Sequence, residues 1–232
     1  MIMTILSILV PALQNRSYYK ILKELNKQSK GLPVEVLCYA DNGELTSGKK
    51  RNILTQSANG KYVAFVDDDD RVCKNYVASI INGCFSDADV ITFDIIKRTP
   101  RKLDERQTFR VGIQDNLYIN NYSGMTANHL CAWKTRVARL VEWPNDLGYG
   151  DDQVWYKTIH LLKNWSEFHI DEVLYIYQWH PTTTVNQTRD NVKKAKYRYR
   201  NGVFIYKNKN GKFAFNRREI SNKIFVGKVM IL

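Results

Sequence analysis

The stretch from residue 61 to residue 70 constrains the fold of this chain more than any other. Its apolar first part, residues 62–66, is rich in β-favouring side chains and stops at four consecutive carboxylates, residues 67–70. This pattern predicts a buried strand that ends in an acidic loop. Because ligands of open α/β sheets bind beyond the carboxyl ends of strands, the loop is either a site or an ordinary solvated turn. Its oxygen ligands suit Mg²⁺ or Mn²⁺, which could in turn hold a diphosphate.

The residues before and after this stretch predict alternating strands and helices. Strands are expected over residues 4–10, where Pro11 ends the first, and over residues 34–40 and 90–93. Helices are expected between them, starting at Ser17, Gly48 and Asn75. A strand, a helix and a second strand in succession form a parallel crossover unit. The sequence therefore predicts an α/β fold with a mostly parallel central sheet and helices on both faces.

The pattern changes after about residue 95. Residues 97–121 are polar and predict irregular or antiparallel structure, and residues 133–141 predict a helix. Gly150 leads into Asp151 and Asp152, which start a helix with Trp155 on its apolar side. A last strand is expected over residues 173–179, just before His180.

The net charge of +12 is concentrated at the end of the chain. Residues 181–232 contain 13 Lys and Arg but only 2 acids, whereas the first 180 residues are nearly balanced. Such asymmetry indicates a polyanionic partner, either nucleic-acid phosphates or an anionic membrane surface. The bases that alternate with aromatic residues are the candidate contacts, and a solvated basic face is the alternative. These bases are Lys193, Lys194, Lys196, Arg198 and Arg200.

The remaining composition predicts a soluble protein of a reducing compartment. The four cysteines form no Cys-x-x-Cys pair, which favours free thiols over a metal site or a disulfide framework. No apolar stretch approaches the roughly 18 residues of a membrane span, and residues 2–10 lack the basic start of a signal peptide. We expect a cytoplasmic protein whose basic end allows association with a membrane surface.

Several motifs, taken in order, resemble those of family 2 glycosyltransferases with the GT-A fold. They are Ser7-Ile8-Leu9-Val10-Pro11, Asp41 after the second strand, Gly48 with Arg51, the acidic residues 67–70, Gly150-Asp151-Asp152-x-x-Trp155, and Tyr177-Gln178-Trp179-His180. The resemblance covers residues 4 to about 185. It implies a glycosyltransferase domain over residues 1–185, with a nucleotide-sugar half (1–95) and an acceptor half (96–185). A basic extension over residues 186–232 follows, with a β-hairpin predicted around Asn208-Lys209-Asn210-Gly211.

This resemblance implies a donor site at the first three strand ends. The implied donor-binding residues are Pro11, Asp41, Arg51, Asp67 and Asp68. Asp41 would accept a hydrogen bond from uracil, or it only forms a turn with Asn42-Gly43. Arg51 would reach the base or the phosphates of a UDP-sugar, or it lies on a solvated helix face. Asp69 and Asp67 match the Asp-x-Asp pair that holds Mn²⁺ or Mg²⁺, and His180 matches a late histidine that completes the metal shell in some GT-A enzymes.

Transfer of a sugar to a hydroxyl group requires one base, for which a carboxylate suffices. Asp152 is the predicted base, since a helix N-terminus favours its ionised form, and Asp151 is the alternative. Both residues could instead only cap the helix. Trp155 would form an acceptor platform or belong to the core, and His129 could line the acceptor side.

Together these features predict a metal-dependent, inverting, non-processive glycosyltransferase. It would move a hexosyl or pentosyl group from a UDP-sugar to an envelope glycan or to hydroxylated DNA. The Gln-x-x-Arg-Trp signature of processive synthases is absent. The alternatives are a nucleic-acid-binding module and a metal-dependent nucleotidyltransferase on a related fold.

Overall fold

The computed structural model describes residues 3–113, 115, 117–119, 122–147 and 150–179, together with the backbone of three strands between residues 198 and 216. The helices are α1 (Tyr19–Ser29), α2 (Ser47–Ser57), α3 (Tyr76–Cys84), α4 (Thr135–Ala138) and α5 (Asp151–Leu162). The strands of the main sheet are β1 (Leu6–Leu13), β2 (Val34–Asp41), β3 (Tyr62–Phe65), β4 (Arg71–Val72), β5 (Val90–Arg98), β6 (Glu105–Arg110), β7 (Leu117–Ile119), β8 (Tyr122–Thr126), β9 (Ala132–Lys134) and β10 (Glu167–Gln178).

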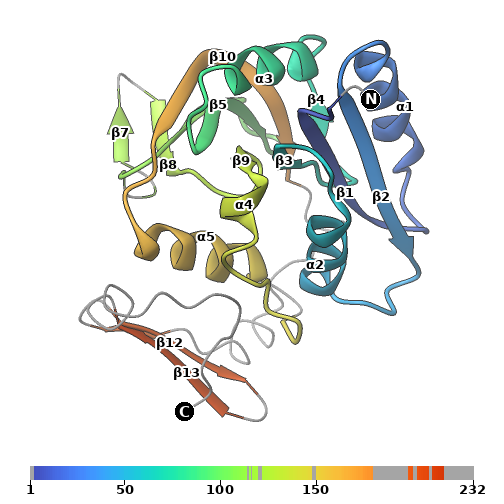
Figure 1. Ribbon diagram of the computed structural model, residues 1–232. Coiled ribbons are helices and arrows are strands. Elements are labelled where there is room, and N and C mark those ends of the chain that lie inside the picture. Colours follow the sequence, from blue (N-terminus) through green and yellow to red (C-terminus); the bar gives the residue numbers. More distant parts are fainter. Residues whose placement is uncertain are drawn as a thin grey trace.

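The centre of the fold is a mixed, mostly parallel sheet in the order β2-β1-β3-β9-β5, with β10 on the free edge of β5 (Figure 1). Strand β1 is parallel to β2 along its whole length and parallel to β3, and β10 is parallel to β5. Strand β9 is antiparallel to both β3 and β5. All the other strands of this set therefore point in one direction, and their carboxyl ends meet along one edge. Strands β6, β8 and β7 extend the sheet beyond β5.

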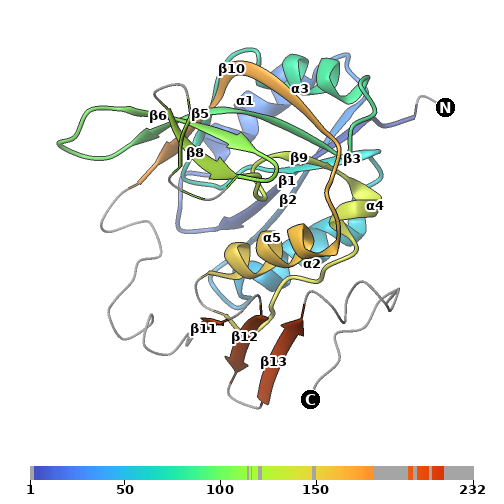
Figure 2. The ribbon, with the colours of Figure 1, turned by 90° about the vertical axis from the view of Figure 1, so that its left-hand side faces the viewer.

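Helices cover both faces of the sheet, as the sequence predicts. Helices α1 and α3 lie on one face, and α2, α4 and α5 lie on the other (Figure 2). Helices α1 and α3 each bury apolar residues at helical spacing, including Ile21, Leu25, Ile80 and Ile81. Among the described residues, none of the helices combines the length and the apolar character that crossing a bilayer requires. The four cysteines are free thiols.

The first strand continues through Pro11, where the sequence argument expects it to stop. The Leu9 carbonyl accepts a hydrogen bond from the Val66 N–H, so the nitrogen of Pro11, two residues later, faces the same edge. The register of β3 on β1 ends at Leu9 opposite Phe65. No ladder hydrogen bond is lost at Pro11, because its missing N–H lies beyond the end of β3.

The segment predicted as a helix over residues 133–141 instead begins with β9 and continues as the short helix α4. Trp133 lies between two strands, opposite Val63 of β3 and Val90 of β5, and is buried. A short apolar run has no period that distinguishes a buried strand from a buried helix. The sheet supplies two unpaired edges at this position, and pairing with both of them decides the outcome.

A separate antiparallel sheet contains β11 (Arg198–Arg200), β12 (Val203–Asn208) and β13 (Gly211–Asn216). Strands β12 and β13 pair with Asn208 opposite Gly211, in the segment for which the hairpin is predicted. The division of the chain into domains stays a prediction.

Helix α2 is held against the segment that follows α4. The Asn52 amide donates to the Trp143 carbonyl and accepts from the Trp143 N–H, both at 2.9 Å. Gly48, in the first turn of α2, lies against the backbone of Pro144, and a Cβ atom at Gly48 would be 1.9 Å from the Pro144 carbonyl oxygen. A glycine is therefore required for this approach of the helix.

The Gly48→Ala variant is expected to lower the free energy of unfolding by about 1–3 kcal/mol, because the added methyl group must push the Pro144 backbone away. Urea denaturation measures the change. The matched control is Ser47→Ala at the neighbouring exposed position, which is expected to be nearly neutral. A stabilised Gly48→Ala protein, as helix propensity alone predicts, would contradict the close contact.

Candidate functional site

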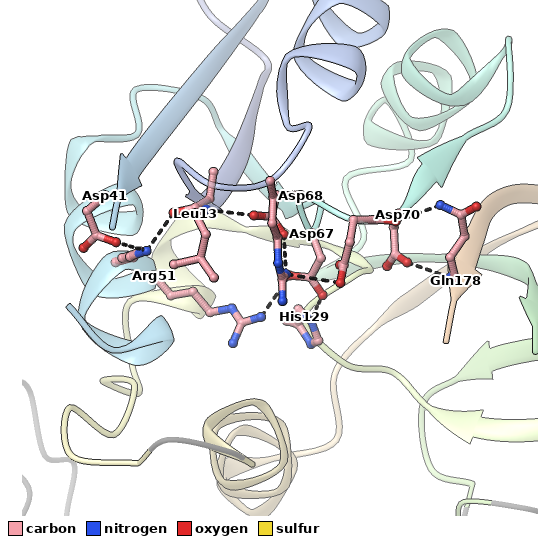
Figure 3. Close-up of polar contacts among 12 residues, drawn as sticks. Leu13, Asp41, Arg51, Asp67, Asp68, Asp70, His129 and Gln178 are labelled. Atoms are coloured by element: carbon pink, nitrogen blue, oxygen red, sulfur yellow. Dashed lines mark hydrogen bonds and ion pairs between the residues drawn. The ribbon is translucent and has the colours of Figure 1, made fainter. Parts of the chain in front are cut away.

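Two aspartates of the acidic loop, residues 67–70, bind the loop to the sheet (Figure 3). Asp68 accepts the Leu13 N–H from the end of β1 at 2.8 Å and Nη1 of Arg16 at 2.7 Å. Asp70 accepts the Tyr175 hydroxyl at 2.8 Å and the Gln178 N–H at 2.7 Å, both from β10. These two carboxylates thus position the loop between β1 and β10.

Arg51 of α2 connects the loop to helix α5. Its Nη2 donates to Asp67 Oδ1 at 3.0 Å, and its Nη1 donates to Asp151 Oδ2 at 2.6 Å. The residue is only 6% exposed, and its guanidinium carbon lies 5.0 Å from the centre of a Trp143 ring. Although burial acts to raise it, the charge of Arg51 and the hydrogen bond with His129 hold the pKa of Asp67 well below its ordinary value. Arg51 therefore contacts carboxylates of the acidic loop and of α5 rather than lying on a solvated helix face.

Asp69 is partly exposed, with a side chain that is 25% accessible, the same fraction as for Asp67. Asp69 lines a cavity of about 830 Å³ whose wall also includes several cations. These cations are Arg16, Lys20, Lys27, Arg71 and Lys74. Burial and the neighbouring Asp67 raise the pKa of Asp69 to about 6, because its charge is repelled while Arg16, at 3.1 Å, offsets this only in part.

His129 lies between the acidic loop and helix α5. Its Nε2 is 3.5 Å from Asp67 Oδ2, and its Nδ1 is 3.9 Å from Asp152 Oδ2. The imidazole is buried, and Nδ1 has no hydrogen-bond partner among the described residues. His129 thus lies between two carboxylates rather than on an exposed acceptor surface.

The two aspartates at the start of α5 have different surroundings. The side chain of Asp151 is 7% exposed and is bound by Arg51, whereas the side chain of Asp152 is 32% exposed. Burial raises the pKa of Asp152 above its ordinary value, although His129 partly opposes the shift. The helix N-terminus alone favours a shift in the opposite direction, so the effect of burial is the larger one. Asp152 is the carboxylate of this pair that solvent and a bound molecule can reach.

Asp41 forms a turn at the end of β2. Its carboxylate accepts the N–H groups of Gly43 and Leu45, each at 2.9 Å, and pairs with Lys50. Although burial acts to raise it, these partners hold the pKa of Asp41 below its ordinary value, with Lys50 the strongest of them. Lys50 is itself buried and donates to the Ala12 carbonyl at 2.7 Å. The geometry is that of the turn-forming alternative.

Of the remaining predicted residues, the structure describes the side chains of Trp155 and Pro11 alone. Trp155 is 1% exposed and stacks on Trp143 with ring centres 4.6 Å apart, so it packs in the core and offers no platform to an acceptor. Pro11 lies within β1, two residues before Leu13. His180, Lys193, Lys194 and Lys196 fall outside the described residues, and only the backbone of Arg198 and Arg200 is described.

The sequence argument missed two basic residues of the site, Arg16 and Lys50. Arg16 follows β1, so its position after a strand end on the same sheet edge as the acidic loop is the available signal. Lys50 precedes Leu54 by four residues, which places it on the buried face of α2. A lysine on the buried face of a helix requires a nearby anion, so its position in the sequence indicates a buried ion pair, which is the pair with Asp41.

Among the described residues, one group of three side chains could hold a metal ion, because its ligand atoms lie within 4.8 Å of one another. The acidic loop contributes no residue to this group. The group consists of Asp94 on β5 with His169 and Asp171 on β10.

No family model matches the chain, and no curated protein matches it either. Its fold is similar to crystal structures of S. aureus TarS residues 1–349. The complex with UDP-GlcNAc is 15% identical with a TM-score of 0.55, covering 78% of this chain and 60% of TarS 1–349. The complex with UDP is 18% identical with a TM-score of 0.53, and the match covers 76% of this chain and 61% of TarS 1–349. The chain thus spans about three fifths of those TarS chains, and the likeness shows a shared fold.

The Arg51→Met variant is expected to lose roughly 3–5 kcal/mol of stability, because it leaves the buried Asp151 without a counter-charge. Thermal and urea unfolding measure the loss. Adding Asp151→Asn is expected to restore part of it, since the uncompensated charge is then removed. Lys49→Met, at an exposed position of the same helix, is the control. Equal stability of Arg51→Met and Lys49→Met would contradict the importance of the buried ion pairs.

Proposed function

We propose that this protein is a metal-dependent, inverting glycosyltransferase that uses a UDP-sugar. The observation that carries the proposal is the convergence of Asp152 with the acidic loop through His129, with Asp69 facing a large cavity. The fold agrees with this proposal, because similar TarS structures contain UDP-GlcNAc or UDP. The sequence motifs that resemble family 2 glycosyltransferases agree independently.

In this proposal the donor lies across the carboxyl ends of β1, β2 and β3. Asp69 is the principal ligand of Mn²⁺ or Mg²⁺, because the two oxygens of Asp67 already contact Arg51 and His129. Its oxygen chemistry and the repulsion that raises its pKa both suit a hard cation. The bound ion would supply positive charge for the departing diphosphate. His180 stays a predicted further ligand, and Asp67, Asp41 and Pro11 stay predicted donor contacts.

The roles of Asp68 and Arg51 in this proposal follow from their partners. Asp68 fixes the loop to the end of β1. Arg51 holds Asp67 and Asp151 in place, and its burial leaves it no direct path to the phosphates. Arg16, which contacts Asp69, is the fixed cation at the cavity and would stabilise charge on the leaving group.

Asp152 would remove the proton from the acceptor hydroxyl group. Its raised pKa makes it a stronger base than an ordinary carboxylate, and its partial exposure makes it accessible. His129 would hold the carboxylate in position, and Arg51 would neutralise Asp151 beside it. One base acting in a direct displacement gives inversion at the anomeric carbon.

The acceptor in this proposal is an envelope glycan or hydroxylated DNA. The basic extension over residues 186–232 would contact that polyanion through Lys193, Lys194, Lys196, Arg198 and Arg200. The same charges would allow a cytoplasmic enzyme to bind at an anionic membrane surface.

The Asp152→Asn variant is expected to retain UDP binding but to lose at least about 100-fold in turnover of a UDP-sugar, because the amide cannot accept the proton. Calorimetry measures binding, and Mn²⁺-dependent donor hydrolysis in a screen of UDP-sugars measures turnover. The matched control is Asp146→Asn, an exposed aspartate before α5. Full turnover in Asp152→Asn would exclude this residue as the base.

The Asp69→Ala variant is expected to abolish the increase in UDP affinity that Mn²⁺ produces, because the cation loses its principal ligand. The difference between UDP titrations with and without Mn²⁺ measures the effect. Asp104→Ala, which removes an exposed carboxylate paired with Arg98, is the control. If no nucleotide sugar binds the wild-type protein in Mn²⁺, the nucleic-acid-binding alternative is favoured instead.

A further inference from the structure

A second cluster of ionisable side chains lies between β5 and β10, outside the acidic loop. Asp94 of β5 and His169 and Asp171 of β10 each offer one ligand atom, all within 4.8 Å of one another. The side chain of Asp94 is 2% exposed, whereas that of Asp171 is 88% exposed. The cluster is therefore buried at Asp94 and open to solvent at Asp171. We call it the β5–β10 cluster.

Hydrogen bonds determine which nitrogen of His169 carries a proton. The Thr92 hydroxyl donates to Glu167 Oε1 at 2.6 Å, since an ionised carboxylate can only accept. The Thr92 oxygen is then the acceptor for His169 Nδ1–H at 3.0 Å. Nε2 is left with its lone pair, and it faces Asp94 Oδ1 at 3.5 Å.

Asp94 has one oxygen that the protein does not satisfy. Arg106 donates through Nε to Oδ2 at 2.8 Å. Oδ1 is buried and finds no hydrogen-bond partner in the part of the chain that the structure describes. A buried carboxylate oxygen opposite an imidazole lone pair is unfavourable unless a hydrogen-bond donor or a cation lies between them. A cation at this position is either an added proton on Nε2 or a metal ion.

An irregularity in β10 brings Asp171 to the same place. Ile170 pairs with Phe93, but the next residue of β5, Asp94, pairs with Val173. Asp171 and its neighbour Glu172 are therefore extra residues in a bulge, and bulges redirect side chains. Arg106 Nη2 contacts Asp171 Oδ1 at 3.1 Å and so holds both carboxylates of the cluster.

We propose that the β5–β10 cluster is a binding site for a divalent transition-metal ion, with Zn²⁺ the expected occupant. The ligands are Asp94 Oδ1, His169 Nε2 and a carboxylate oxygen of Asp171. One imidazole and two carboxylates suit Zn²⁺ better than Mg²⁺ or Ca²⁺, which prefer oxygen ligands alone. The exposed side near Asp171 leaves a fourth position for water.

The surroundings of the cluster have the form of a metal site. A histidine ligand commonly donates its other N–H to a fixed acceptor, which here is Thr92 backed by Glu167. The ion would join β5 to β10, the strand whose Tyr175 and Gln178 bind Asp70 of the acidic loop. Its role would be to hold the β10 side of the candidate active site.

Titration with Co²⁺, a coloured substitute for Zn²⁺, tests the site at neutral pH. The full chain carries Asp69→Asn, so that the acidic loop does not contribute. One equivalent of Co²⁺ is expected to bind with visible absorption bands, and Zn²⁺ is expected to displace it. Asp171→Asn and His169→Gln are each expected to weaken binding by at least about tenfold, and Thr92→Val by roughly 10–100-fold through the lost Nδ1–H acceptor. Asp104→Asn, at an exposed carboxylate, is expected to leave binding unchanged.

Two results would overturn the proposal. The first is the absence of Co²⁺ and Zn²⁺ binding, and a doubly protonated His169 in nitrogen NMR spectra at neutral pH would then identify the cation as a proton. The second is metal binding that none of Asp171→Asn, His169→Gln and Thr92→Val weakens. Asp171 is exposed, so its variant tests the ligand without disturbing the core.

Discussion

The candidate site depends on the ion pairs that the Arg51 guanidinium forms with two carboxylates. The guanidinium is buried between α2, the acidic loop and α5, and it pairs with Asp67 and Asp151. A buried cation without such partners would be strongly unfavourable, so the two carboxylates must converge on it. Their convergence fixes the first turn of α5, and Asp152 follows directly in that turn. The distance between the proposed base and the proposed donor loop is thus set by a buried charge rather than by a ligand.

Local features of the sequence predicted the main elements of this architecture. Strand β2 and the start of α5 at Asp151 lie within a residue of their predicted bounds, and α1 and α3 bury apolar residues at helical spacing. Each of these depends on residues a few positions apart, and side-chain periodicity records such relations. The location of the acidic loop at a strand end follows from the same local pattern.

The partners of each side chain could not be predicted in this way. Arg51 and Asp151 are 100 residues apart in sequence, yet their contact decides which carboxylate of α5 stays accessible. The sequence makes Trp155 an acceptor candidate, whereas its stacking on Trp143 places it in the core. The β9 strand likewise depends on two sheet edges that only the folded protein supplies. The sequence shows which residue types could serve a function. Which partner each carboxylate oxygen or aromatic ring contacts is decided only by the tertiary structure.

The stacked indoles of Trp143 and Trp155 make the contact between α5 and the segment bound to α2 visible to spectroscopy. Their planes are within 1° of parallel, and Trp143 also carries the Arg51 guanidinium on its face. The transition dipoles of two indole rings this close couple, so the near-ultraviolet circular dichroism of the protein reports the relative orientation of the rings. Trp155 belongs to α5 and Trp143 to the segment that binds α2. Any rotation of α5 that separated the proposed base from the acidic loop would therefore change an intrinsic optical signal, with no label attached.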